Sequence, residues 1–199
     1  MAGRARLRRD RAGAHRAAQQ PPEPRSPELT LTVWTIGHST RPTDEFLELL
    51  DEFGIEAIAD VRRHPGSRHQ PQYARDALCR TLEASGRCYR WLPLLGGRRR
   101  PLPDSPNTGW RSAAFRGYAD YLATEPFAEG LFELTMMAGG LRTAVMCAEA
   151  VWWRCHRSLI ADVLLVSGVE VTHILGPGSA APHPYTPPAR VTGGRLTYP

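Results

Sequence analysis

Residues 31–40 read LTVWTIGHST. The first six of them are apolar or β-branched, which is typical of a buried strand. Glycine and three polar residues follow, and an apolar pattern of helical period then runs over residues 43–53. The stretch therefore predicts a strand, a polar loop and a helix, which together form the first unit of an α/β fold.

The same alternation continues along the chain. The remaining predicted strands and helices cover, in order, strand 55–61, helix 73–85, strand 88–91, helices 112–124 and 126–138, strand 142–147, helix 155–167 and strand 169–174. Alternation of this kind predicts a mainly parallel sheet of about five strands with helices on both faces. The first strand-to-helix turn lacks the G-x-G-x-x-G fingerprint, so we expect Rossmann-like layering without a dinucleotide site, and we predict no cofactor.

The two ends of the chain differ in composition from the middle. Residues 1–29 are rich in Arg, Ala, Gln and Pro and lack an apolar period, which predicts a disordered tail. Residues 176–199 are rich in Pro and Gly, which predicts a loose C-terminal tail after Gly176. The α/β domain is then expected over 30–175. The charge of +5 resides in these ends, with +4 in 1–29, +2 in 176–199 and −1 between them. Salt-dependent binding of nucleic acid is therefore expected mainly from the tails.

Composition excludes several classes of protein. All 25 basic residues are arginine, so Schiff-base chemistry on a lysine and a P-loop are excluded. No apolar run approaches the roughly 18–20 residues that a membrane span needs, and we expect no membrane partner. No secretory signal is recognisable, and the four cysteines do not have the spacing of a disulfide scaffold, which favours a cytoplasmic, reducing location. The oligomeric state stays open.

Polar residues gather where the predicted strands end. His38 and Ser39 end the first strand; Asp60 and Arg62 end the second, with Ser67 and Arg68 close behind; Cys147 and Glu149 end the fourth; Cys155, His156 and Arg157 open the next helix. The carboxyl ends of parallel strands meet at one edge of a sheet, where ligands bind in such folds. The sequence therefore predicts one site at this edge.

Cys155 is the candidate nucleophile of that site. A helix start favours a thiolate, and His156 and Arg157 would add positive potential. The alternative is that Cys155 is a small buried hydrophobe and Arg157 pairs with Glu149 or Asp60. Glu149 could transfer protons beside Cys147 or simply neutralise Arg157.

The other cysteines and histidines are weaker candidates. Cys147 is either catalytic or structural, whereas Cys79 and Cys88 are assigned to the core. His38 is a better candidate for proton transfer than the histidines of the polar loop, and His173 is expected to be a satisfied core histidine.

Sharper motifs do not fit. The interval between Cys147 and Arg154 is one residue too long for the C-x5-R loop of tyrosine phosphatases, and the residues between are apolar. A structural zinc site usually shows two cysteines two to four residues apart. Here Cys147 and Cys155 lie further apart, and adjacent Cys155 and His156 would diverge by about 100° on a helix. The prediction is that no metal binds.

An ordered set of short motifs nevertheless resembles a known family. The set comprises Thr35-Ile36-Gly37-His38-Ser39, Asp60-Val61-Arg62 with Pro65 and Ser67, Leu95-Gly96-Gly97, Phe115-Arg116-Gly117-Tyr118-Ala119, Cys147-Ala148-Glu149 and Cys155-His156-Arg157. Over about residues 31–175 it is similar to the bacterial and archaeal family called domain of unknown function 488. The resemblance implies an α/β fold and functional roles for Cys147 and Cys155, without a settled reaction. The chain departs from many relatives at Val151-Trp152-Trp153, an apolar stretch that suggests a partner surface or a packed lid.

The leading hypothesis is an enzyme with an anion-binding site. Arg62, Arg68 and Arg157 would hold the phosphate or carboxylate of a small ligand, a nucleotide or a nucleic-acid end, with Ser39, Asp60 and Ser67 nearby. Cys155 would be the nucleophile, and His38, Glu149 or His156 would move protons. The alternative is a non-catalytic module that binds nucleic acid or protein through Arg98-Arg99-Arg100 and the N-terminal tail.

Overall fold

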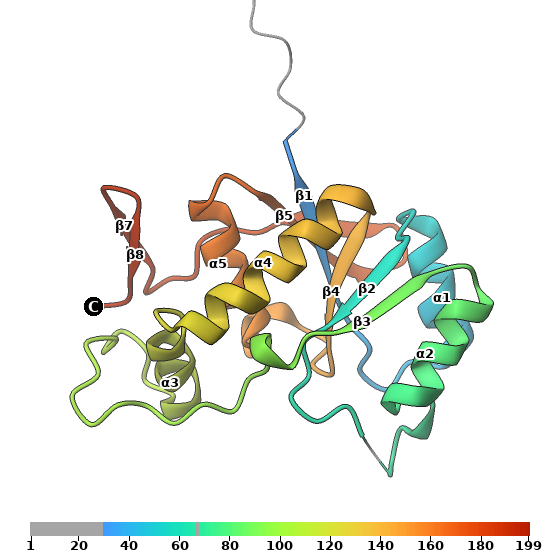
Figure 1. Cartoon of the computed structure of the whole chain (residues 1–199), viewed down its shortest axis with the longest axis horizontal. Coiled ribbons are helices and arrows are strands. Elements are labelled where there is room, and N and C mark those ends of the chain that lie inside the picture. The colour runs from blue at the N-terminus through green and yellow to red at the C-terminus, as the bar shows by residue number, and fades with distance from the viewer. Residues whose placement is uncertain (1–29, 67) are drawn as a thin grey trace, which may run out of the picture.

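A central sheet organises the molecule in the computed structural model, which describes residues 30–66 and 68–199 (Figure 1). Its strand order is β3-β2-β4-β1-β5-β6. The strands are β1 Thr32–Gly37, β2 Ala57–Asp60, β3 Cys88–Trp91, β4 Thr143–Cys147, β5 Glu170–Gly176 and β6 Ser179–Pro182. The first five are mutually parallel, and β6 pairs antiparallel with β5. The predicted parallel α/β sheet is confirmed, with one antiparallel edge strand added.

Helices cover both faces of the sheet. They are α1 Thr43–Glu52, α2 Arg75–Ala84, α3 Ala113–Tyr121, α4 Glu125–Gly140 and α5 Arg157–Val166. Side chains of a strand alternate between its faces, so Ala144 and Met146 of β4 pack with apolar residues of α1 and α2. Val145 and Cys147 point the other way and pack with α3, α4 and α5. Two apolar cores on opposite faces of the sheet therefore hold the strands in place.

The order of the strands creates a crevice at their carboxyl ends. After β1 the chain enters α1, whereas after the neighbouring β4 it enters α5 on the opposite face. Loops that leave adjacent strands in opposite directions open the space in which ligands of α/β proteins bind. The ladder between the two strands reaches this edge, because the His38 amide donates to the Cys147 carbonyl (3.0 Å) and the Ser39 amide to that of Ala148 (2.9 Å).

The C-terminal segment is built into the fold, and the prediction of a loose tail after Gly176 is wrong. Besides β6, it forms the hairpin of β7 Arg190–Thr192 and β8 Arg195–Thr197. Three of its side chains, His183, Thr186 and Tyr198, are buried. All three bond the buried Asp162 of α5: Oδ1 accepts from His183 Nε2 (3.0 Å), and Oδ2 from the Thr186 hydroxyl (2.5 Å) and the Tyr198 hydroxyl (3.0 Å). A carboxylate removed from water needs such donors, so Asp162 anchors the C-terminal segment to α5.

Asp120 of α3 organises the long segment between β3 and α3. Its carboxylate accepts hydrogen bonds from the Leu102 amide (2.8 Å), the Ser105 hydroxyl (2.5 Å) and the Asn107 side chain (2.8 Å). Gly117 lets the helix approach this segment, because a Cβ there would lie 2.5 Å from the Arg99 carbonyl oxygen. The segment is thereby fixed as one wall of the crevice.

Two further predictions concern the N-terminal segment and membrane-spanning helices. The predicted disorder of residues 1–29 concerns a stretch outside the described residues. Among the helices of the described part, none is long and apolar enough to cross a membrane.

Candidate active site

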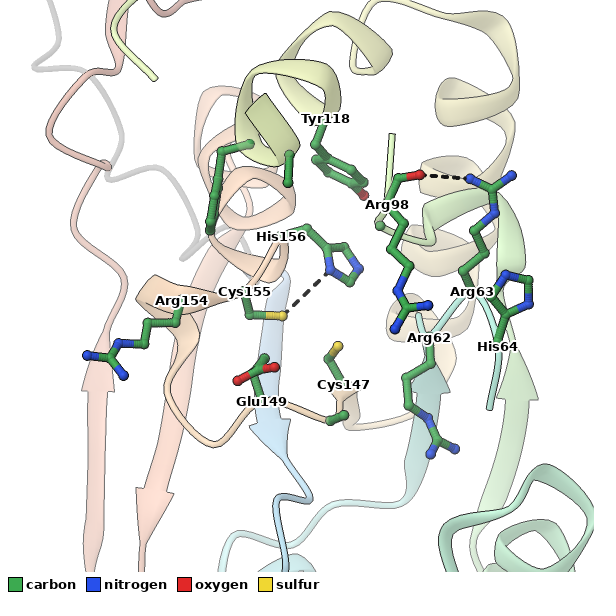
Figure 2. Close-up of a pocket in the computed structure, with 14 residues that line it drawn as sticks. Arg62, Arg63, His64, Arg98, Tyr118, Cys147, Glu149, Arg154, Cys155 and His156 are labelled. Atoms are coloured by element: carbon green, nitrogen blue, oxygen red, sulfur yellow. Dashed lines mark hydrogen bonds between the residues drawn. The ribbon is translucent and has the colours of Figure 1, made fainter. Parts of the chain in front are cut away.

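A pocket of about 370 Å³ lies at the carboxyl edge of the sheet (Figure 2). Its lining combines thiols, imidazoles and guanidinium groups with one carboxylate. The lining residues are Arg62, Arg63, His64, Gly97, Arg98, Ala114, Phe115, Tyr118, Cys147, Ala148, Glu149, Arg154, Cys155 and His156. The predicted convergence of strand ends is therefore found for β2 and β4 and for the segment that leads into α5.

Cys155 lies at the bottom of this pocket with only 3% of its surface exposed. It lies two residues before the start of α5, with extended backbone (φ −129°, ψ 146°), and does not belong to the helix itself. Its sulfur lies 3.6 Å from Nδ1 of His156 and accepts a hydrogen bond from Nε of Arg157 (3.4 Å). The thiol is thus placed between two cationic or potentially cationic side chains.

The orientation of the His156 ring is fixed from both sides. Its Nε2 lies 3.2 Å from the carbonyl oxygen of Val61, which can only accept, so this nitrogen carries a proton. Nδ1 is therefore the atom that exchanges a proton with Cys155. Gly97 packs against the ring, since a Cβ there would lie 2.8 Å from Nδ1. Tyr118, whose hydroxyl donates to the Leu95 carbonyl (2.7 Å), lies 5.0 Å from the ring centroid to centroid.

These surroundings favour the thiolate of Cys155. Burial alone would raise the pKa of the thiol, but the hydrogen bond with Cys147 and the positive charges of His156 and Arg157 lower it well below its usual value. The pKa of Cys147 moves the other way, because hydrogen bonding to Cys155, burial and the charge of the Cys155 thiolate all disfavour a second anion. The two shifts therefore favour the anion on Cys155 and the proton on Cys147.

The argument that Cys155 and His156 diverge on a helix is wrong, because both precede α5. The two sulfurs and a ring nitrogen of His156 all lie within 4.8 Å of one another. Two thiolates and an imidazole are ligands that soft divalent metals such as zinc accept. Geometry alone thus allows these three residues to hold a metal ion, in contrast to what their spacing in the sequence suggests.

Arg157 is almost fully buried, yet the alternative that it pairs with Glu149 or Asp60 is not what the structure shows. Its Nη2 donates to the backbone carbonyl of Glu149 (2.5 Å), and its Nε to Cys155. The Glu149 carboxylate is free to face solvent and lines the pocket. The guanidinium therefore keeps its charge available to the sulfur.

Asp60, Arg62 and His38 form a separate buried network at the ends of β1 and β2. The Asp60 carboxylate accepts from Nε (2.9 Å) and Nη2 (2.6 Å) of Arg62 and from the Tyr89 hydroxyl (2.7 Å). Arg62 also donates from Nη1 to His38 Nε2 (3.1 Å) and to the Tyr73 carbonyl (2.8 Å). Most of the polar atoms of this network are used within the protein.

His38 is removed from proton transfer by these contacts. Its Nε2 accepts from Arg62, so the proton is on Nδ1, which donates to the Ser39 carbonyl (2.9 Å). Burial first, and then the charge of Arg62, lower its pKa to about 4. The ring stacks on Tyr73 with centroids 4.0 Å apart and is not among the side chains that line the pocket.

Ser39 and Arg68 do not line the pocket. Ser39 adopts a left-handed backbone (φ 52°) and bonds the loop after β4. Arg68 is exposed and is not part of the pocket lining, and Ser67 lies outside the described residues.

The assignment of Cys79 and Cys88 to the core is wrong. Cys79 is half-buried on α2 and donates to Glu83 (3.2 Å). Cys88 is exposed, because β3 is the edge strand of the sheet and its side chains alternate between exposed and half-buried. These two thiols therefore provide an accessible internal contrast to the buried pair.

The structure adds to the pocket cations that the sequence analysis did not assign to it, Arg98 having been assigned to the alternative binding module. Arg63, His64, Arg98 and Arg154 line the pocket and expose much of their surface to solvent. Arg98 has a left-handed backbone (φ 60°), unusual without glycine, and its carbonyl accepts from Arg63 Nη1 (3.0 Å). No local sequence pattern signals this conformation, because arginine rarely adopts it.

Fold and pocket together define an α/β protein with a thiol- and arginine-lined pocket at the topological switch of its sheet. Residues 42–164 match the family described as "Domain of unknown function DUF488". Because the match covers more than half of the chain, the protein belongs to this family. Searches of the curated proteins and of the solved structures gave no match.

Proposed function

We propose that this protein is an enzyme that binds a phosphate- or carboxylate-bearing ligand and attacks it with the thiolate of Cys155. The observation that carries the proposal is the position of one sulfur, between His156 and Arg157, at the bottom of a pocket whose rim is arginine-rich. A nucleophilic cysteine needs a partner that accepts its proton and a positive field that stabilises the anion. Both are present here, within hydrogen-bond reach.

The rim supports binding of an anion. Arg63, Arg98 and Arg154 surround the mouth of the pocket, and among the described residues Glu149 is the only carboxylate in its lining. Guanidinium groups bind phosphate and carboxylate oxygens with paired hydrogen bonds. A nucleotide, a phosphorylated metabolite or the end of a nucleic acid carries the matching group.

The proposed reaction follows from the positions of the Cys155 sulfur and of the two ring nitrogens of His156. The Cys155 thiolate attacks the phosphorus or acyl carbon of the ligand, forming a bond to sulfur while the bond to the leaving group breaks. The leaving group takes the proton that His156 holds on Nδ1. Glu149 then accepts a proton from water, and the resulting hydroxide releases the second product and restores the thiolate. The proton on Glu149 passes through solvent to Nδ1 of His156, which returns both side chains to their starting states.

Ligand binding tests the first half of the proposal. Thermal unfolding of the full chain is followed with nucleotides, phosphorylated metabolites and inorganic phosphate. A ligand at about a hundredfold excess over its Kd should stabilise the protein by about 2.7 kcal/mol. The double variant R98A/R154A should lose this stabilisation, whereas R100A, an exposed arginine outside the lining, should keep it. Equal stabilisation of both variants would place the ligand elsewhere.

Intermediate trapping tests the second half. With a ligand found in that screen, acid quenching and intact-mass measurement should detect an adduct on Cys155 that C155S cannot form. Wild-type turnover that persists undiminished in C155S would remove the thiol from the mechanism.

A non-catalytic nucleic-acid or protein-binding module is the second candidate. It is favoured by Trp153, which exposes 53% of its surface beside Arg154 at the pocket, since single-stranded bases stack on such residues. Oligonucleotide binding over a salt series distinguishes the candidates. A module should bind without turnover and lose affinity in W153A, while deletion of residues 1–29 should remove most of the salt dependence if the tail supplies the charge.

A further inference from the structure

Cys147 and Cys155 come from different elements of the fold but meet in one pocket. Cys147 ends β4 and Cys155 lies two residues before the start of α5, yet their sulfurs lie within 4.8 Å of each other. Both line the same pocket, where each is less than a tenth exposed. Figure 2 shows the two side chains directed into one space, with His156 above them.

Contacts to the sulfurs assign different chemical roles to the two residues. Cys155 receives the Nε–H of Arg157 and lies beside Nδ1 of His156, which favours an anionic sulfur. The Cys147 sulfur lies within 4.8 Å of that sulfur and of a ring nitrogen of His156, so it is the thiol placed to react with an oxidised Cys155. A thiolate that attacks and a neighbouring thiol that resolves are the two components of a peroxide-reactive cysteine pair.

We propose that the Cys147–Cys155 pair is an oxidation site, at which a small hydroperoxide converts the two thiols into a disulfide. The proposal rests on the proposed function only in that the disulfide removes the nucleophile required there, so oxidation would switch off that same site. Formation of the disulfide itself needs no anionic ligand.

The oxidation proceeds in two balanced steps. The Cys155 thiolate attacks the outer oxygen of the hydroperoxide, the O–O bond breaks, and the alkoxide takes a proton from Nδ1 of His156, leaving a sulfenic acid and an alcohol. Cys147 then attacks the Cys155 sulfur as its S–H proton passes to the departing hydroxide, which leaves as water. Sulfur loses two electrons overall and the peroxide gains them.

Closure must bring the two sulfurs from within 4.8 Å of each other to about 2.05 Å, an approach that side-chain rotation and movement of the segment between them would supply. Residues 148–154 between them contain bends and one turn of 3-10 helix, Trp152–Arg154, instead of a continuous helix. Closing the bond would release Cys155 from Arg157.

The test uses the full chain in a C79S/C88S background, which removes the two thiols outside the pocket. Reduced protein, dialysed and assayed for bound metal, is treated with stoichiometric hydrogen peroxide. Intact mass should fall by two hydrogens, and peptide mapping should join Cys147 to Cys155. The further variant C147S should instead stop at a sulfenic acid that dimedone traps on Cys155, and C155S should leave Cys147 reduced.

Three results would overturn the proposal. One is a C79S/C88S protein that stays reduced under peroxide that oxidises free cysteine, with circular dichroism confirming that it is folded. Another is equal oxidation of Cys147 in C155S. The third is zinc or copper that is retained through dialysis and whose removal leaves the thiols still unreactive, which would make the group a metal site.

Failure of this inference is separable from failure of the proposed function. If anions bind to the reduced protein but no disulfide forms, only the oxidation site is lost. If the disulfide forms while no phosphate- or carboxylate-bearing ligand binds, the oxidation site stands alone.

Discussion

Two buried charged clusters lie at the same edge of the sheet, and they differ in where their polar atoms point. In the Asp60–Arg62–His38 network, carboxylate, guanidinium and imidazole satisfy one another and nearby backbone. In the Cys155–His156–Arg157 cluster, the sulfur is supported by both neighbours but still opens on a pocket. A network whose donors and acceptors are paired within the protein stabilises the fold, whereas a reactive atom must remain accessible for bonding to a ligand. The comparison predicts stability effects for the first cluster and reactivity effects for the second.

Removal of Asp60 should give the largest effect on stability. The variant D60A leaves the Arg62 guanidinium buried without its partner, and breaking a buried pair in this way costs about 3–5 kcal/mol. The free energy of unfolding is measured by urea denaturation. C155A, the matched change in the other cluster, removes weaker contacts and should cost no more than about 2 kcal/mol. Equal losses in the two variants would abolish the distinction between the clusters.

The labelling rate of Cys155 should depend on its own cluster and not on the Asp60–Arg62–His38 network. Because the pKa of Cys155 is lowered, a small alkylating reagent should modify it at mildly acidic pH, where ordinary thiols with a pKa near ~8.5 are mostly protonated. H156N removes one stabilising charge and should slow labelling about tenfold at pH 6, the effect of a pKa rise of about one unit. D60N, if folded, should label at the wild-type rate.

Mass spectrometry of pulse-labelled protein separates the four cysteines. Cys88 is exposed and serves as the accessible reference, whose rate should rise steeply with pH as an ordinary thiol does. The pH profile of Cys155 should be displaced to lower pH by comparison. A Cys155 profile parallel to that of Cys88 would show that the cluster does not stabilise a thiolate.

The Asp60–Arg62–His38 network also predicts how stability changes with pH. The pKa of His38 is lowered to about 4 by burial and Arg62, and that of His173 to about 3 by burial and the neighbouring His183. Between these values and about 6.5 the unfolded chain binds protons that the folded protein does not. Stability should therefore fall as pH drops through this window, by up to about 1.4 kcal/mol per pH unit for each histidine.

Denaturation midpoints at pH 7, 6 and 5 measure this slope. H38N should reduce it, because asparagine does not titrate. An unchanged slope in H38N would show that the ring is not held neutral by the network.

The sequence could specify the elements because their patterns are local. Apolar periodicity and turn residues placed each strand of the parallel sheet and each helix within a few residues, and parallel alternation then implied the shared edge. It also placed Cys147, Cys155 and His156 together. What it could not supply was the direction of side chains at that edge, which separates His38 from the pocket.

Long-range partners were equally inaccessible to sequence patterns. Asp162 lies in the middle of an apolar helix, and nothing local indicates that His183, Thr186 and Tyr198 will fold back to satisfy it. Pro and Gly in this segment suggested a loose tail because their usual role is in loops. Trp152 of the unusual apolar stretch stacks on His173 (centroids 4.4 Å apart), whereas Trp153 is exposed, so one residue packs and its neighbour does not.

Glu149 should give the smallest effect. Its carboxylate lines the same pocket as Cys155 but is exposed, and its backbone carbonyl, not its side chain, engages Arg157. A negative charge near the sulfur opposes the thiolate, so E149Q should speed labelling of Cys155 at pH 6. Solvent screens an exposed charge, which limits such an interaction to about 1 kcal/mol, or about fivefold in rate.

E133Q is the matched control, because Glu133 is an exposed carboxylate on α4 outside the pocket lining, and it should leave the rate unchanged. Because salt weakens interactions between exposed charges, the E149Q effect should shrink further at 1 M salt, while the H156N effect, made by direct contact, should persist. A slower rate in E149Q would mean that the carboxylate supports the thiolate through His156 instead of opposing it. The role of Glu149 in the proposed enzyme reaction would then be activation of the nucleophile, not activation of water.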